Sequence, residues 1–586
     1  MISGGSENVL VMWQMDTSKT SFLPHLSGSI ENIVVSSTGS SYVLHLDDNS
    51  AMILSTAELK PTAYVAGIQS FASHGSTPKD MLVKRAWSTR EHVLRKIPAA
   101  IRSTEPSQLH VCVGSGQQAT MSGSLSAPLL QSFDLESFTS INRQPLARTQ
   151  PTDLNLSNKG LPIDEPLVTH LSFSSDGQWL ASVDVWNPPK NDVDQVISGV
   201  KDQFIRERQE VYLKFWQVGS SDASAALVSR INMPHSTDSL EGVLDLAADP
   251  VSPCFATIGG DGMVRVWRPK LRQQNGVVVK GVDGEDASTW ACTQVIPVGD
   301  GLGEEAVDLL NSNTFGRPQG ALAFSEDGST IFAAYGTIDS GVVYIINASS
   351  GEVVRTLEDL WTGKLRSIRT LSPFILVLSN ELRVFDVVGD ELRYGIRMPG
   401  ASKAGDLLQL AVDYTSRHFA VAAATLETRT VGVFDPETAG PLLVKTLPYP
   451  AVSLVSTPNK SGFLALDDAA QVWTITEGSN ASSLAAMQPL TDLRLDEQPV
   501  ANGAVRIQED ADMASDDEED AGPAAAADND IEMGDDDDDN YASVVVQQHL
   551  ADIFDAAPAF AAPSVEEMFY KVTDLLGAKP LLTATE

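Results

Sequence analysis

Four side chains around one predicted hairpin could form a relay of hydrogen bonds. They are His235, Thr257, Asp261 and Trp267, and an Asp-Gly pair suited to a tight turn precedes the strand that ends at the tryptophan. An indole N–H, a hydroxyl, an imidazole and a carboxylate can pass hydrogen bonds from a surface loop to the middle of a sheet. We predict that these four residues form a structural network. A catalytic pair of His235 and Asp261 is the less favoured interpretation, because their spacing already has a structural use.

The most basic stretch of the chain is KRAWSTREHVLRKIPAAIR, residues 84–102. One acid, Glu91, offsets its six cations, which are Lys84, Arg85, Arg90, Arg95, Lys96 and Arg102. Such clusters contact RNA phosphates, dock an acidic protein, or lie in a solvated loop. The residues alone leave these three interpretations open, and we expect contact with RNA or with an acidic partner.

The sequence carries none of the familiar catalytic or cofactor motifs. GxSxG, GxxxxGK[ST] and HExxH are absent, and the nine histidines do not cluster at metal-ligand spacings. The three cysteines are far apart, with no CxxC, so we expect buried thiols rather than a disulfide framework or a zinc site. We therefore predict that the protein is not an enzyme and has no metal, cofactor or small-molecule substrate.

A capped amphipathic helix is predicted near the C-terminus, in SVEEMFYKVTDLLG at 564–577. Ser564 and Glu567 have the spacing of a capping box, and Gly577 suits the end of the helix. One face carries Met568, Val572, Leu575 and Leu576. A tethered helix of this kind commonly docks in a groove on a partner. Packing against its own domain is the alternative interpretation.

Negative charge is concentrated in one tract of this acidic chain. The formal net charge is −37, and 16 acidic residues but no Lys or Arg lie between Glu509 and Asp539. The remainder is still acidic, which disfavours general wrapping of nucleic acid by a basic surface. We predict an acidic disordered linker over 481–540 and a short helical tail over 541–586. No apolar run is long enough to span a bilayer, so no membrane partner is expected.

One strand pattern recurs along the chain. Alternating apolar residues lead to an aromatic in NVLVMWQM (8–15), VYLKFWQV (211–218), GMVRVWRP (262–269), ELRVFDVV (381–388), TVGVFDPE (430–437) and AQVWTITE (470–477). Apolar hairpins with Ser/Asp/Gly turns precede several of these segments. The resulting units begin near residues 30, 100, 166, 241, 318, 366, 406 and 450. We predict an all-β fold, a β-propeller of seven to eight four-stranded blades.

The two ends of the repeat array suggest how the ring closes. The unit at 451–476 supplies three strands, and residues 20–26 supply an unassigned one. We predict a propeller over 20–480 in which strand 20–26 pairs with 451–476, because closure removes exposed sheet edges. Residues 1–19 are then expected to be trailing strands of an upstream propeller, with 1–15 poorly packed.

The propeller region, residues 1–476, resembles the WD-repeat (Nan-one type) subunits of the UtpA, or transcription-associated, subcomplex of the small-subunit processome. The segments that carry the resemblance are GGSENVLVMWQM and the residues that follow it to 69, INMPH (231–235), WACTQV (290–295) and FSEDGS (324–329). That family has two tandem propellers, and this chain matches the second. The resemblance also places His235, Thr257, Asp261 and Trp267 in the network that ties a WD-type blade together.

The resemblance implies a non-catalytic scaffold in the nucleus and nucleolus. Its partners would be other UtpA subunits, pre-ribosomal RNA and the U-three small nucleolar ribonucleoprotein. Its role would be in pre-rRNA processing, 40S ribosome biogenesis and the rDNA transcription linked to them. The alternative is a WD-repeat peptide-binding adaptor in a ubiquitin ligase or a chromatin complex.

Overall fold

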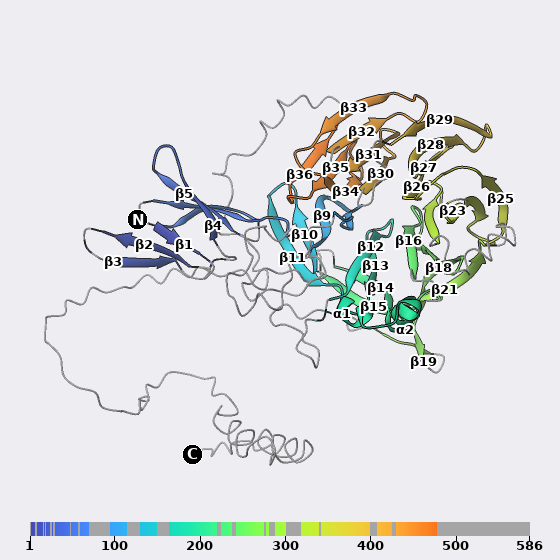
Figure 1. Cartoon of the computed structure of the whole chain (residues 1–586), viewed down its shortest axis with the longest axis horizontal. Helices are drawn as coiled ribbons and strands as arrows, with labels where there is room; N and C mark the ends of the chain where they lie inside the picture. The colour runs from blue at the N-terminus through green and yellow to red at the C-terminus, as the bar shows by residue number, and fades with distance from the viewer. Residues whose placement is uncertain are drawn as a thin grey trace, which may run out of the picture. The chain divides into compact units, whose positions relative to one another are not determined.

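Antiparallel sheets, most of them with four strands, make up nearly all of the structure (Figure 1). The computed structural model describes residues 2–69, 94–113, 129–148, 163–299 and 318–476, apart from short gaps within these ranges. Seven sheets follow one another along residues 99–475 of this part of the chain, and each adjoins the next through its first strand. The all-β propeller fold predicted from the repeats is confirmed.

The first strand of each sheet lies innermost in the ring. These strands are β8 (Ala99–Arg102), β12 (Leu167–Phe173), β16 (Val243–Ala248), β22 (Gln319–Phe324), β26 (Ser367–Leu371), β30 (Leu407–Asp413) and β34 (Ala451–Ser456). Consecutive members contact one another in this order, and β34 contacts β8, which closes the ring. The predicted unit starts from 100 to 450 each fall within two residues of one of these strands.

The second strands are β9 (Glu105–Val113), β13 (Trp179–Trp186), β17 (Phe255–Gly259), β23 (Thr330–Gly336), β27 (Phe374–Leu378), β31 (His418–Ala424) and β35 (Phe463–Asp467). The third strands are β10 (Leu129–Asp134), β14 (Glu210–Val218), β18 (Met263–Leu271), β24 (Gly341–Asn347), β28 (Glu381–Asp386), β32 (Arg429–Phe434) and β36 (Val472–Ile475). The outermost strands are β11 (Thr139–Pro145), β15 (Ala225–Asn232), β21 (Ser288–Pro297), β25 (Val353–Glu358), β29 (Glu391–Arg397) and β33 (Pro441–Thr446).

Short elements interrupt two of the connections between strands. A small hairpin of β19 (Gln273–Gln274) and β20 (Val277–Val278) lies between β18 and β21. Between β13 and β14 the chain forms helices α1 (Lys190–Asp194) and α2 (Lys201–Arg208), with a 3-10 turn at Ser198–Val200. None of the helices in the described residues is long and apolar enough to cross a membrane.

Burial follows the position of a strand within its sheet. The second strand β27 reads FILVL and is buried throughout, because neighbouring sheets cover both of its faces. The outermost strand β29 reads ELRYGIR and is largely exposed. Aromatic packing joins adjacent sheets, as where the ring of Phe215 stacks on Trp290 with centroids 4.3 Å apart and planes 7° apart. The periodic strands therefore build a continuous core around the ring.

Strand 20–26 does not close the ring in the predicted way. β3 (Lys19–Leu23) pairs with β2 (Leu10–Gln14), and within the described residues β36 is hydrogen-bonded only to β35. The short turn between β2 and β3 costs far less chain entropy than a pairing with a segment more than 400 residues away. The contact between β34 and β8 closes the ring instead.

The first seven strands form two sheets that share their own core. One sheet contains β1 (Ile2–Gly4), β2 and β3, and the other contains β4 (Ile30–Val35), β5 (Ser41–Leu46), β6 (Ala51–Ser55) and β7 (Pro61–Val65). Leu10 and Leu26 pack there with Leu44 and Leu54. Leu10 is fully buried, so the expectation that residues 1–15 pack poorly is wrong at this position. The predicted unit at residue 30 is thus a four-stranded sheet, but it belongs to this core and not to the ring.

Candidate functional site

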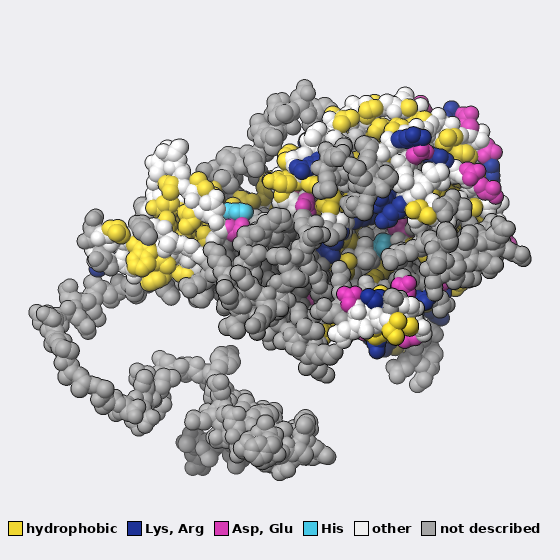
Figure 2. Space-filling view, viewed as in Figure 1, with side chains coloured by type: hydrophobic (Ala, Val, Ile, Leu, Met, Phe, Trp, Pro, Cys, Tyr) yellow, Lys and Arg dark blue, Asp and Glu magenta, His cyan; other side chains and the backbone are white. Residues whose placement is uncertain are grey.

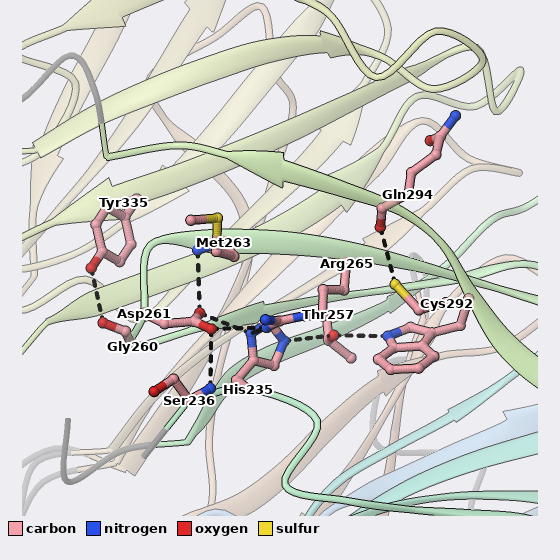
Figure 3. A network of polar contacts seen from close by, with 11 residues as sticks. His235, Ser236, Thr257, Gly260, Asp261, Met263, Arg265, Cys292, Gln294 and Tyr335 are labelled. Atoms are coloured by element: carbon pink, nitrogen blue, oxygen red, sulfur yellow. Dashed lines mark hydrogen bonds and ion pairs between the residues drawn. The ribbon is translucent and has the colours of Figure 1, made fainter. Parts of the chain in front are cut away.

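The structure brings His235, Thr257, Asp261 and Trp267 together in one chain of hydrogen bonds (Figure 3). The indole Nε1 of Trp267 donates to Thr257 Oγ1 at 2.9 Å, and Thr257 Oγ1 lies 2.8 Å from His235 Nε2. His235 Nδ1 lies 2.9 Å from Asp261 Oδ1. Gly262, at φ +67°, makes the tight turn that places Asp261 between β17 and β18.

His235 lies between partners on both sides of its ring. Nε2 faces the hydroxyl of Thr257, which accepts from the indole, and Nδ1 faces the carboxylate of Asp261 and, at 2.5 Å, Nη1 of Arg265. Burial lowers the pKa of His235, so the imidazole is neutral. Burial raises the pKa of Asp261, but hydrogen bonds from His235, Arg265 and the Ser236 amide outweigh it, and the pKa lies well below its usual range. A neutral histidine held between two fixed partners has a structural role.

Thr257→Val tests how much this network stabilises the ring. The substitution keeps the shape of the side chain but leaves the indole N–H of Trp267 and the Nε2 of His235 without partners. Since an unpaired buried polar group is costly, we expect a loss of about 2 kcal/mol in the free energy of unfolding, measured by urea denaturation. Thr293→Val, on the outer strand of the same sheet, removes a longer bond of 3.2 Å and should cost less than about 0.5 kcal/mol. Equal losses for the two variants would contradict the network's role.

Two other sheets carry parts of such a network that sequence analysis missed. In one, Trp216 Nε1 donates to Ser182 Oγ at 2.9 Å, and in the last sheet Trp473 Nε1 donates to Asp467 Oδ2 at 2.9 Å. The available signal was a polar residue on the second strand and a tryptophan on the third.

The structure describes three of the six cations in the basic window. Lys84, Arg85 and Arg90 lie outside the described residues, and Arg95 and Lys96 lie just ahead of β8. Arg102 is 4% exposed, and its guanidinium donates to Gly177 O at 2.7 Å and to Gly219 O at 2.9 Å. Arg102 thus joins the first sheet of the ring to the second. It is unavailable to RNA or to a partner, which corrects the prediction for this residue.

The remaining predicted sites can be placed only in part. Met568, Val572, Leu575 and Leu576 lie outside the described residues, as do 481–540 and 541–586. The described residues contain no group of three or more His, Cys, Asp or Glu side chains that could hold a metal ion. Cys112 and Cys254 are buried as expected, but Cys292 is exposed because it lies on the outer strand β21.

Sequence analysis also missed charged residues that lie between the sheets or on the innermost strands of the ring. Asp184 and Lys214 form a buried ion pair with Lys214 Nζ 2.7 Å from Asp184 Oδ1. His170, Asp245 and Arg369 lie on the innermost strands β12, β16 and β26. A charged residue within an otherwise apolar strand, as in WLASVDVW and VYLKFW, was the signal that could have found them.

Comparison with known proteins gives relatives along most of the chain. No protein-family model matches it. U3 small nucleolar RNA-associated protein 17 of Schizosaccharomyces pombe is 26% identical over 479 residues, which are 80% of this chain and 52% of that protein. WD repeat-containing protein 75 of Xenopus laevis is 26% identical over 50% of this chain and 28% of that protein. NET1-associated nuclear protein 1 of Saccharomyces cerevisiae is 22% identical over 57% of this chain and 35% of that protein.

The chain spans about half the length, or less, of these curated relatives. Among solved structures, the Cps50 (Swd1) β-propeller domain of Myceliophteria thermophila aligns at 12% identity and a TM-score of 0.40, covering 65% of this chain and 97% of that domain. The fold assignment rests on the strand pairing described above.

Proposed function

We propose that this chain, a homologue of U3 small nucleolar RNA-associated protein 17, WD repeat-containing protein 75 and NET1-associated nuclear protein 1, is a non-catalytic scaffold subunit of the small-subunit processome. The observation that carries the proposal is the similarity to the first of these proteins over 80% of the chain. A rigid ring of sheets with separate faces can hold several partners in a fixed arrangement, which fits a scaffold.

The proposed partners follow from this assignment. They are the other UtpA subunits, pre-ribosomal RNA and the U-three small nucleolar ribonucleoprotein, met in the nucleolus. The role is in pre-rRNA processing, 40S biogenesis and linked rDNA transcription. Affinity purification of the full chain should recover processome subunits together with pre-ribosomal RNA, and depletion should lower the amount of small-subunit rRNA. Recovery of a ubiquitin ligase or a chromatin complex instead would support the alternative, a peptide-binding adaptor.

We further propose that the basic window contacts RNA or an acidic partner within the assembly. Its three cations outside the described residues, Lys84, Arg85 and Arg90, are tested by reversing each to Glu. The expected result is a roughly tenfold loss of crosslinking to RNA or to the neighbouring protein. If the contact is with RNA phosphates, the plot of the logarithm of the binding constant against the logarithm of salt concentration should also become less steep, by about 2.

The matched control places the same charge change elsewhere on the surface. Lys270, Arg272 and Lys280 are exposed on and beside β18 and the β19–β20 hairpin. Reversing these three to Glu should leave crosslinking within about twofold of the unchanged protein. If both triple variants crosslink as well as the wild type, the basic window is a solvated loop.

A further inference from the structure

The short segment that follows the first two sheets contacts both those sheets and the ring. The two sheets, formed by residues 2–65, are called the N-terminal body here. The segment after them is residues 66–69, with the sequence AGIQ, and is called the joint segment. Two bodies joined by a loop usually move relative to each other. The contacts of the joint segment decide whether it is a hinge or a fixed connection.

The first sheet of the ring binds the backbone of the joint segment. Gln131 is buried on β10, and its Oε1 accepts from the Gln69 amide at 2.9 Å. Its Nε2 donates to Gly67 O, also at 2.9 Å. The Ala66 amide donates to Phe138 O, in the turn between β10 and β11, at 3.2 Å. A hinge motion at this segment would have to break these bonds and leave the buried amide of Gln131 without partners, which is costly.

The N-terminal body contacts the same four residues. Asn49 lies in the turn between β5 and β6 at φ +60°, a conformation that asparagine tolerates. Its Nδ2 donates to Ile68 O at 3.0 Å. A Cβ added to Gly67 would lie 2.1 Å from Asn49 O, so glycine is needed for the two backbones to approach this closely. The body therefore packs directly against the segment that the ring binds.

Apolar packing continues from the body to the ring through the joint segment. Ala66 and Ile68 are both buried. Their core also contains Leu109 of the first sheet and Val452 of the last sheet, so it lies where the ring closes. Tyr64, at the end of the body, packs against this core and against the core of the body. Close-packed side chains on both sides oppose rotation of the segment.

We propose that residues 66–69 are a rigid joint that holds the N-terminal body in one orientation on the ring. Rotation of the body would break the bonds to Gln131, open the contact with Asn49 and expose Ile68 to water, all at once. Since these losses occur together, intermediate orientations are not populated. The proposal is independent of the processome assignment, because it rests on contacts within the chain.

A fixed orientation matters because the N-terminal body has its own exposed surface. Hydrophobic side chains lie on that surface (Figure 2). They include Trp13 and Phe22, which are 44% and 62% exposed. The rigid joint sets the direction in which this surface faces relative to the ring. The body and the ring then act as one scaffold rather than as two domains on a flexible connection.

The test measures distances between two spin labels on the full chain by pulsed electron paramagnetic resonance. Cys292, on the ring, is exposed and can be labelled, whereas Cys112 and Cys254 are buried. Ser37→Cys adds an exposed thiol on the body, in the turn between β4 and β5. This pair should give one narrow distance distribution. Its width should be within about twofold of that for Cys292 with Ala439→Cys, a reference pair that lies entirely on the ring.

Two variants should loosen the joint while the ring stays intact. Gly67→Ala forces the segment away from Asn49, and Gln131→Leu removes the bonds to the segment backbone. Each should broaden the distribution between the body and the ring by about twofold or more. Gly199→Ala is the matched control, because its added Cβ meets nothing within 4 Å, and it should leave the width unchanged. The reference pair should stay narrow in all three variants.

Three results would overturn the proposal. A broad distribution between the body and the ring in the chain with an unchanged joint segment would mean that residues 66–69 are a hinge. A distribution that stays narrow in both Gly67→Ala and Gln131→Leu would mean that other contacts set the orientation. Broadening of the reference pair in these variants would mean that the segment maintains the ring itself rather than the orientation of the body.

Discussion

Replacing Asp184 by alanine will lower the free energy of unfolding by about 3–5 kcal/mol, because it leaves a buried lysine without its counter-ion. Lys214 Nζ lies 2.7 Å from Asp184 Oδ1, and the two side chains are 8% and 2% exposed. Lys214 also donates to Leu146 O at 2.8 Å, which fixes the ammonium between the first and second sheets of the ring. An ammonium held in this position cannot turn toward water when the carboxylate is removed.

The ion pair itself is expected to add little net stability. Burial raises the pKa of Asp184 even though the charge and hydrogen bond of Lys214 act to lower it. The cost of removing this carboxylate from water therefore exceeds the attraction that it gains. Replacing both residues, with Asp184→Leu and Lys214→Met, should restore most of the stability lost in the single variant, because it removes both buried charges.

Urea denaturation followed by tryptophan fluorescence distinguishes these cases. The control is Glu391→Ala, which breaks an ion pair to Arg393 of 2.9 Å whose side chains are 44% and 56% exposed. Because exposed pairs contribute little, this variant should lose less than about 0.5 kcal/mol. If the double variant is no more stable than Asp184→Ala, the attraction within the buried pair exceeds the cost of removing its two charges from water.

The arrangement of the sheets was predictable because it is encoded locally. Turns such as Asp261-Gly262 and the aromatic strands that follow them recur, and the strand starts fall close to the predicted positions. Ring closure depends instead on competition between pairings. The strand at 19–23 can pair with a free sheet edge, but β2 ends at Gln14, shortly before it in the chain, and pairs with it instead. A repeat pattern in the sequence does not show which of two possible partners a strand will pair with.

The candidate sites were less predictable because they depend on contacts between distant segments. From the sequence, Arg102 was one of six cations expected to contact RNA or a partner. In the structure its position on β8 lets the guanidinium donate to the carbonyl oxygens of Gly177 and Gly219. The charge of Arg369 acts on Lys96 only in the folded ring, since these residues are far apart in the sequence. The network at Trp267 could be predicted from the sequence because three of its members lie on one hairpin.

Acidification will destabilise the ring through His110, which lies on β9 and is 1% exposed. Its Nδ1 is 2.9 Å from Ser132 Oγ, and its ring packs against Phe173 with centroids 4.8 Å apart. Burial, and to a lesser degree the charge of Arg102, lowers the pKa of His110 from 6.5 to about 4. The folded protein therefore holds the imidazole neutral at a pH at which the unfolded chain protonates it.

The sign and the range of this effect follow from linkage. Since the folded pKa is below the unfolded pKa, the stabilising contribution is complete above about pH 6.5 and is lost progressively as the pH falls toward about 4. A shift of this size corresponds to about 3 kcal/mol. His110→Gln retains a polar partner for Ser132 but does not titrate, so its stability should fall less steeply between about pH 6.5 and 4.5 in urea denaturation.

The curve of His110→Gln should converge with that of the wild type as the pH falls. His170 and His235 also have pKa values lowered by burial, so part of the acid sensitivity will persist in His110→Gln. Parallel curves for His110→Gln and the wild type would require that the folded protein accommodates a charged His110, which the buried packing against Phe173 opposes.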